Sequence, residues 1–127
     1  MIAGESKLAL PASPTSAGVA RAFVRRWCSD LDSADTLDAV ALCVSELVTN
    51  ALDHAAPPYE LRVARACGWL RVEVTDASTG MPVVRPFEPT AGRGRGIFLV
   101  EHVSTLWGVE QKRAGKTVWA EFSTPES

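Results

Sequence analysis

The sequence contains few of the features that mark specialised protein classes. It has three cysteines in 127 residues, and their odd number and lack of Cys-x-x-Cys spacing argue against a disulfide framework or a metal module. We expect Cys28, Cys43 and Cys67 to be small reduced core residues. The net charge is −2, from 13 basic and 15 acidic residues, so no basic excess points to direct nucleic-acid binding.

Long hydrophobic runs are also missing. A membrane-spanning helix needs about eighteen or more consecutive apolar residues, and the apolar stretches here are much shorter. The first residues, MIAGESKLALP, lack the basic start and apolar run of a secretion signal. We therefore expect a cytoplasmic protein that has no membrane partner.

What remains is the composition of an ordinary globular domain, with 46% hydrophobic and 22% charged residues. A chain of this length buries roughly two-thirds of the surface that its unfolded form exposes, so it needs no disulfide or metal to hold a core. No repeat or linker divides the sequence. We expect one domain over residues 1–127, with an ordered core at about 7–123.

Two stretches with helical spacing follow a short predicted strand at residues 7–10. Apolar residues recur every four positions over 19–31, and Thr15 or Ser16 precedes them as a possible helix cap. The second stretch is clearer, because apolar residues at three- and four-residue spacing over 37–51 mark one buried stripe.

Alternation of apolar and polar residues predicts four further strands. An irregular segment at 77–93, long for a compact domain, is a candidate ligand loop, and a helical pattern resumes at 97–103. The order predicts an α+β two-layer sandwich, in which a mixed sheet is covered on one face by three helices. The four alternating segments are 59–63, 70–76, 107–111 and 117–122.

Polar residues of the second helix form a first candidate site. Glu46, Thr49, Asn50 and Asp53 are predicted to lie opposite the buried stripe, and a solvated helix face is the ordinary explanation. An Asn inside a helix is several tenths of a kcal/mol less favourable than Ala, however. The Asn50 amide oxygen would suit a hard cation such as Mg²⁺. Glu46, one turn earlier, would suit a general base.

Asp76 is a second candidate, because the alternation of its strand places it on the apolar side. A buried carboxylate is costly unless a donor meets it, and the exocyclic amine of a ligand would be such a donor. The alternative is an Asp that accepts backbone N–H groups from the turn at 77–80. Gly80 adds a position where the backbone can approach a ligand closely.

A glycine-rich segment at the start of the third helix is the last candidate. Gly92, Gly94 and Gly96 allow successive backbone N–H groups to turn toward an anion at a helix N-terminus. Arg93 and Arg95 add positive charge beside them. A flexible hairpin or helix entry would look similar, and the segment matches neither a Walker loop nor a dinucleotide-binding fingerprint.

In this order and at these distances, the three elements resemble the motifs of the GHKL ATPase superfamily, which includes histidine kinase ATP sites. Residues 46–51 resemble its N box, 76–80 its first glycine box and 92–100 its second. The resemblance extends over residues 8–122. The small size, the Trp-Gly-Val step at 107–109 and the closing segment 115–119 most resemble single-domain ATP-binding proteins related to anti-sigma factor serine/threonine kinases.

The resemblance implies a role for each matching residue. Glu46 would be the catalytic base and Asn50 the magnesium ligand, while Asp76 would accept the adenine amino group. The cofactors would be ATP and Mg²⁺. The residues implied in nucleotide binding are Asn50, Asp76, Gly80, Gly92, Arg93, Gly94, Arg95, Gly96 and Thr117.

The function implied is that of an anti-sigma factor kinase, which would sequester a sigma factor and transfer the ATP γ-phosphoryl group to a Ser or Thr of an antagonist protein. A homodimer is also compatible with the resemblance. Trp69 and Trp119 lie opposite the apolar residues of their strands and form the predicted partner surface.

Two other functions remain open. A non-catalytic module that binds a nucleotide or sequesters a partner is favoured by departures from the superfamily pattern: Ser78 replaces a glycine, Lys116 stands in the position of a threonine, and Asp53 replaces a basic residue. Glu46 favours the kinase, because a nucleotide holder has little need of a carboxylate at the γ-phosphate. A two-carboxylate hydrolase that uses Glu46 and Asp76 is weaker, because no spacing brings the two elements together.

Overall fold

A computed structural model describes residues 4–31, 33–78 and 104–124. The predicted element order is confirmed over these residues, while the helix predicted at 97–103 lies outside them. The elements are β1 (Gly4–Leu10), α1 (Ser16–Trp27), α2 (Ala34–His54), β2 (Tyr59–Ala66), β3 (Trp69–Asp76), β4 (Leu106–Lys112) and β5 (Gly115–Ser123).

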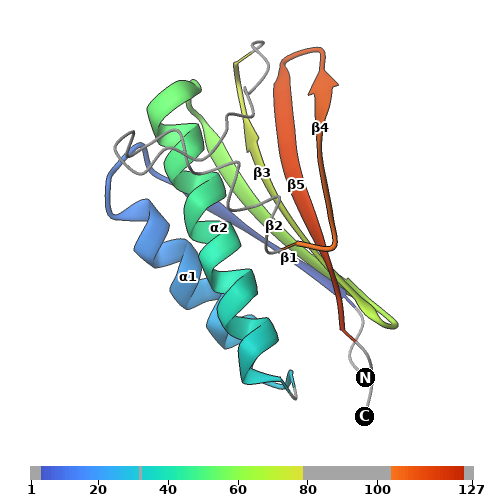
Figure 1. Cartoon of the computed structure of the whole chain (residues 1–127). Coiled ribbons are helices and arrows are strands. Elements are labelled where there is room, and N and C mark those ends of the chain that lie inside the picture. Colours follow the sequence, from blue (N-terminus) through green and yellow to red (C-terminus); the bar gives the residue numbers. More distant parts are fainter. Residues whose placement is uncertain (1–3, 32, 79–103, 125–127) are drawn as a thin grey trace, which may run out of the picture.

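The five strands form one sheet in the order β1-β2-β3-β5-β4. All four neighbouring pairs are antiparallel, so the prediction of a mixed sheet is wrong for the described strands. Short connections explain two of these pairs, because a two-residue turn with Gly68 at a φ of 78° joins β2 to β3, and β4 turns directly into β5. Helices α1 and α2 cover one face of the sheet, which confirms the two-layer α+β architecture (Figure 1).

The two helices begin differently. The Ser33 hydroxyl accepts a hydrogen bond of 3.1 Å from the Thr36 N–H and so caps α2. The hydroxyl cap predicted for α1 is not formed, because Thr15 makes no capping bond and the Ser16 hydroxyl donates to the Pro11 carbonyl. Within the described ranges, neither helix is long and apolar enough to cross a membrane.

The core lies between α2 and the inner face of the sheet. The apolar stripe of α2 packs against alternate residues of β2, β3 and β5, as the two periodicities predict. Cys28 and Cys43 are buried there, and burial raises the pKa of these thiols to about 11 and about 12 respectively. Cys67 is exposed, so its predicted core placement is wrong, because it stands in the β2–β3 turn.

The outer face of the sheet carries tryptophan and charged side chains. Trp69 is 41% exposed, which confirms its predicted surface position. Trp119 is only half-buried, and the Arg71 guanidinium carbon lies 4.3 Å from its ring centroid. Gly108 leaves room for this ring, because a Cβ atom at Gly108 would lie 2.6 Å from a Trp119 ring carbon.

Candidate functional site

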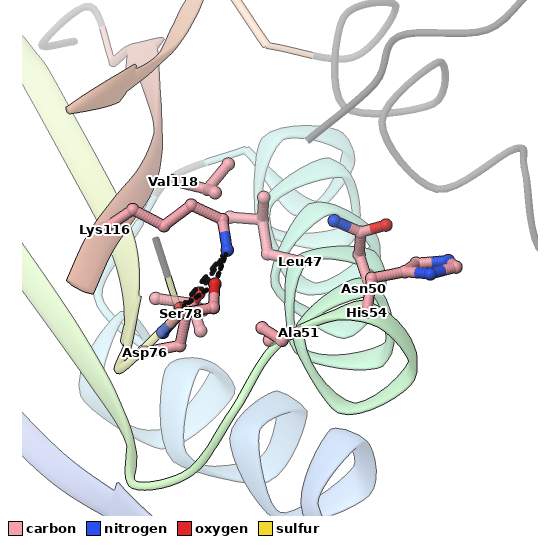
Figure 2. A pocket seen from close by; sticks show the side chains of 10 residues that line it. Leu47, Asn50, Ala51, His54, Asp76, Ser78, Lys116 and Val118 are labelled. Atoms are coloured by element: carbon pink, nitrogen blue, oxygen red, sulfur yellow. Dashed lines mark hydrogen bonds and ion pairs between the residues drawn. The ribbon is translucent and has the colours of Figure 1, made fainter. Parts of the chain in front are cut away.

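A cavity of about 110 Å³ lies where the C-terminal half of α2 faces the end of β3 and the start of β5 (Figure 2). Its position follows from the topology, because β3 and β5 are neighbours in the centre of the sheet and α2 packs over both of them. The polar residues that line it are Asn50, His54, Asp76, Ser78 and Lys116, and Leu47, Ala51, Ala55, Val74 and Val118 complete the wall.

Asp76 is the most buried polar residue of this cavity. It ends β3 on the same side as Val72 and Val74, which confirms its predicted core-facing position. Its side chain is only 1% exposed. A carboxylate at this depth requires several donors to offset the loss of water.

The Asp76 carboxylate already has such donors. Its Oδ1 accepts hydrogen bonds of 2.7 Å from both the backbone N–H and the hydroxyl of Ser78. The Lys116 Nζ donates to Oδ2 at 3.0 Å and to Oδ1 at 3.2 Å, and also to the Ser78 hydroxyl oxygen (Figure 2). The turn interaction predicted as the alternative for Asp76 is thus present, together with an ion pair that the sequence analysis does not predict.

Lys116 lines the cavity, but the sequence analysis does not assign it to the candidate site. Its side chain is 6% exposed, and the antiparallel register places Lys116 directly opposite Asp76. A signal was available in the sequence, because Val118, Ala120 and Phe122 alternate along β5 and Lys116 continues their apolar side. A charged residue on that side is as unusual as Asp76 on its own strand.

The close approach of the two strands depends on Gly115. A Cβ atom at this position would lie 1.9 Å from the Asp76 carbonyl oxygen and 2.9 Å from the Ala77 Cα. Only glycine fits here without movement of the backbone. On the other side, the Ala77 N–H donates to the Ala56 carbonyl at 2.9 Å, which ties the end of β3 to the segment after α2.

Asn50 lines the cavity beside Leu47 and Ala51, so the predicted position opposite the apolar stripe is wrong for this residue. Each residue turns an α-helix by about 100°, which puts Asn50 only about 60° from Leu47 around the axis. It therefore lies on the flank of the stripe. In the view of Figure 2, Leu47 and Ala51 lie between the ion pair and the Asn50 side chain.

Glu46 lies one turn before Asn50 on α2 and is half-buried. The helix rotation places the two residues within about 40° of each other, on the same flank. Glu46 does not line the cavity itself. Its predicted role as a base stays a prediction.

Thr117 is separated from the cavity by the sheet. Its side chain points to the outer face, where its Oγ1 and the Thr75 Oγ1 form a hydrogen bond of 2.7 Å. Alternation along β5 causes this placement, because the neighbouring Lys116 takes the inner face. The structure therefore brings together Asn50 and Asp76 of the predicted site, but not Thr117.

The remaining predicted site residues lie outside the described ranges, so their roles stay predictions. These residues are Gly80, Gly92, Arg93, Gly94, Arg95 and Gly96.

The amide oxygen of Asn50 is a suitable magnesium ligand at this cavity, where the Asp76 carboxylate is already engaged by Ser78 and Lys116. Over the residues that the structure describes, His, Cys, Asp and Glu side chains form no group of three able to hold a metal. This fits an ion that takes few protein ligands and obtains its other oxygens from phosphates and water, as Mg²⁺ commonly does.

A second hollow, of about 330 Å³, lies between the β1–α1 connection and the end of α2. Among the described residues, Asp53 of the first candidate site lines it, whereas Glu46, Asn50, Asp76 and Thr117 do not. Its walls are formed by Ala12, Ser13, Pro14, Leu52, Asp53 and Tyr59.

Comparison with protein families matches residues 10–122 to the model of the histidine kinase-like ATPase domain. The match includes every described element of the cavity. No functionally curated protein matches the chain by sequence.

Two solved structures share the fold. The RsbU and RsbW domains of Rv1364c from Mycobacterium tuberculosis superpose with a TM-score of 0.71 and 16% identity, over 98% of this chain and 33% of that one. The histidine kinase domain of the blue-light activated kinase from Erythrobacter litoralis EL346 gives a TM-score of 0.55 and 23% identity, over 87% of this chain and 60% of that one. This chain therefore spans about a third and three-fifths of the two longer chains.

Proposed function

Because this chain belongs to the histidine kinase-like ATPase domain family, we propose that it binds Mg-ATP in the cavity between α2, β3 and β5. We propose further that it is a regulator of the anti-sigma factor kinase type. It sequesters a sigma factor and transfers the γ-phosphoryl group of ATP to a Ser or Thr hydroxyl of an antagonist protein. These partner classes rest on the motif resemblance of the sequence.

One observation carries the proposal of nucleotide binding. A carboxylate that is 1% exposed and an amide from a different element, Asp76 and Asn50, line the same small cavity of a domain whose family is named for ATPases. A base amine would donate to Asp76 at the buried end. Asn50 would hold Mg²⁺ near the phosphates, where the ion neutralises charge on the transferred group.

The proposed transfer needs few protein groups. The Glu46 carboxylate accepts the proton of the Ser or Thr hydroxyl, whose oxygen forms a bond to the γ-phosphorus. The bond between the γ-phosphorus and the bridging oxygen breaks, and ADP leaves with that electron pair. The glycines at 92, 94 and 96, with Arg93 and Arg95, are the predicted phosphate cradle.

A second candidate, a non-catalytic module that sequesters a partner, is favoured by the Lys116–Asp76 ion pair. The pair satisfies the Asp76 carboxylate from within the chain. A site that no longer takes a nucleotide would need such an internal donor.

Thermal unfolding with and without Mg-ATP tests the proposal. A ligand at a hundredfold excess over its dissociation constant stabilises the folded chain by about 2.7 kcal/mol, so we expect a concentration-dependent rise in Tm. The variant Glu110→Gln, which changes an exposed carboxylate of β4 outside the cavity, serves as the matched control and should keep this rise. No rise at millimolar Mg-ATP would overturn ATP binding.

Transfer is tested with γ-labelled ATP and a partner that co-purifies with the chain. We expect label on a Ser or Thr of the partner. Glu46→Gln should abolish this label while the Mg-ATP-dependent rise in Tm persists. Unchanged labelling in Glu46→Gln would contradict the role of Glu46 as the base.

A further inference from the structure

The end of the cavity where a base amine would donate is filled by a side chain of the same protein. The Lys116 ammonium lies 3.0 and 3.2 Å from the two oxygens of Asp76 and also donates to Ser78 (Figure 2). Over the described residues, the buried side-chain polar atom that lacks a hydrogen bond is the Arg65 Nε, so these three side chains are satisfied. Both oxygens of Asp76 thus have donors without a ligand, three on Oδ1 and one on Oδ2.

The fold itself does not require this ion pair. The other inner-face residues of β5, from Val118 to Phe122, are apolar and pack into the core. Replacing a buried ion pair by apolar residues of similar volume is often neutral or stabilising. A Lys side chain that is 94% buried, as follows from its 6% exposure, is therefore costly at a position where an apolar side chain would serve.

We propose that Lys116 competes with the nucleotide base for Asp76 and thereby sets how tightly this cavity binds a nucleotide. This inference rests on the proposed function, because it assumes that a base enters the cavity. The base amine and the ammonium are donors to the same two oxygens. When the base amine takes the place of the ammonium, the ion pair is exchanged for a hydrogen bond from a neutral donor to the carboxylate, and the ammonium must withdraw.

Withdrawal is feasible for Lys116 because its ammonium is carried on four rotatable carbons. The backbone N–H of Ser78 cannot withdraw in the same way, since it donates to Asp76 at 2.7 Å within the turn. The Ser78 hydroxyl can rotate but stays on the same turn, so the lysine is the charged donor that a ligand can displace without a change in the backbone.

The affinity for Mg-ADP, measured by isothermal titration calorimetry, tests the competition. Lys116→Met keeps an apolar side chain of similar length and removes the ammonium. We expect it to bind Mg-ADP at least about tenfold more tightly than the natural chain, which corresponds to the loss of one competing charge-assisted hydrogen bond. Lys112→Met is the matched control, because Lys112 is exposed on the adjacent strand and should leave the affinity unchanged.

The outcomes separate this inference from the proposed function. Binding by the natural chain with equal or weaker binding by Lys116→Met overturns the competition and leaves the proposed function intact. Binding by Lys116→Met alone supports the competition and overturns ATP binding by the natural chain. Binding by neither overturns both.

A measurement on the natural chain covers the case in which the variant does not fold. The sequence has three lysines, Lys7, Lys112 and Lys116, so their side-chain signals can be separated by ¹³C-lysine NMR. On saturation with Mg-ADP, we expect the Cε signal of Lys116 to move toward those of Lys7 and Lys112, which are exposed. An unchanged Lys116 signal in the nucleotide-bound chain would overturn the proposal.

Discussion

Two charge clusters bridge the same pair of strands, β3 and β5, on opposite faces of the sheet. On the inner face, Asp76 and Lys116 are 1% and 6% exposed and meet beneath α2. On the outer face, Arg71 faces Glu121 across the strands, and their side chains are 28% and 25% exposed. The register is shared, so the difference lies in access to water and in the number of partners.

The outer cluster shares its charge among many groups. Arg71 donates to Glu73 at 2.6 Å and to Glu121 at 2.9 Å, and Arg62 joins Glu73 to Glu5 on β1. Burial lowers the pKa of Arg71, but hydrogen bonds to Glu121 and Glu73 raise it above its ordinary value. When one member is lost, the remaining members and water still solvate the other charges, so this cluster is a solvated surface feature.

Among the residues that the structure describes, the hydrogen-bond partners of Asp76 and Lys116 are each other and Ser78. The charges of this inner pair are almost entirely removed from water, so neither partner can be lost without leaving a buried charge. The comparison teaches that position in the sheet alone does not indicate function. Desolvated charge next to a cavity marks a candidate site, because apolar side chains would serve the core at these positions.

The largest expected effect is the loss of one partner of the inner pair. Asp76→Asn leaves the Lys116 ammonium buried without its counter-charge, and we expect the free energy of unfolding to fall by about 3–5 kcal/mol. The double variant Asp76→Asn/Lys116→Met removes both charges and should recover most of this loss. Urea denaturation measures the free energy of unfolding of both variants. A loss below about 1 kcal/mol for Asp76→Asn would show that the inner pair contributes no more than an exposed surface pair.

Two glycines at close approaches, Gly115 next to Asp76 and Gly108 next to Trp119, extend the comparison. Gly115→Ala places a Cβ 1.9 Å from a backbone oxygen, and such overpacking is expected to cost about 1–3 kcal/mol or more. Gly108→Ala meets the Trp119 side chain, which can shift, so its loss should be smaller. Gly18→Ala in α1 is the control, because its nearest neighbour at 3.5 Å is an ordinary contact and helix propensity should make the variant neutral or stabilising. Equal losses for the first two would contradict the argument that the backbone at Asp76 gives way less easily than the Trp119 side chain.

Removing one charge from the outer cluster should have a smaller effect. Glu121→Gln is expected to cost about 0.2–1 kcal/mol, because Arg71 keeps Glu73 and partial access to water. The loss of stability in Glu121→Gln should be smaller still at 1 M salt, where exposed charges are screened. Chemical denaturation at low and high salt measures it, and a loss as large as that of Asp76→Asn would remove the distinction between the two faces.

A third pair is intermediate in burial and gives a test by pH. Arg65 donates to Asp30 at 2.6 Å, and their side chains are 7% and 43% exposed. The hydrogen bond from Arg65 lowers the pKa of Asp30. A lowered pKa contributes stability above the unfolded value, and that stability is lost as the pH falls through the folded value. The Tm of Asp30→Asn should therefore lie slightly below that of the natural chain at pH 7 and converge with it under acidic conditions.

Local patterns predict much of this molecule. The strands, both described helices and the buried position of Asp76 follow from periods of two and of about 3.6 residues. The same alternation places Lys116 inside and Thr117 outside. Thr117 was assigned to nucleotide binding from the motif resemblance, and the parity of its own strand argues against that role for its side chain.

Other features depend on information that local patterns do not contain. The ion pair exists because the β3–β5 register sets Asp76 opposite Lys116, and register is a property of two distant segments. The missing cap of α1 has a similar origin, because the Ser16 hydroxyl finds a better acceptor in the Pro11 carbonyl. The flank position of Asn50 is different, because the helical rotation of about 100° per residue already places Asn50 about 60° from Leu47.

The most direct test of the account is a ¹⁵N–¹H NMR titration of the natural chain with Mg-ATP. If Asp76 receives the base, the largest shifts among the described residues should fall on the amides of Asp76, Ser78 and Lys116, with Asn50 next. Saturable shifts confined to the second hollow, around Ser13 and Tyr59, or no shifts at millimolar Mg-ATP, would contradict the central claim.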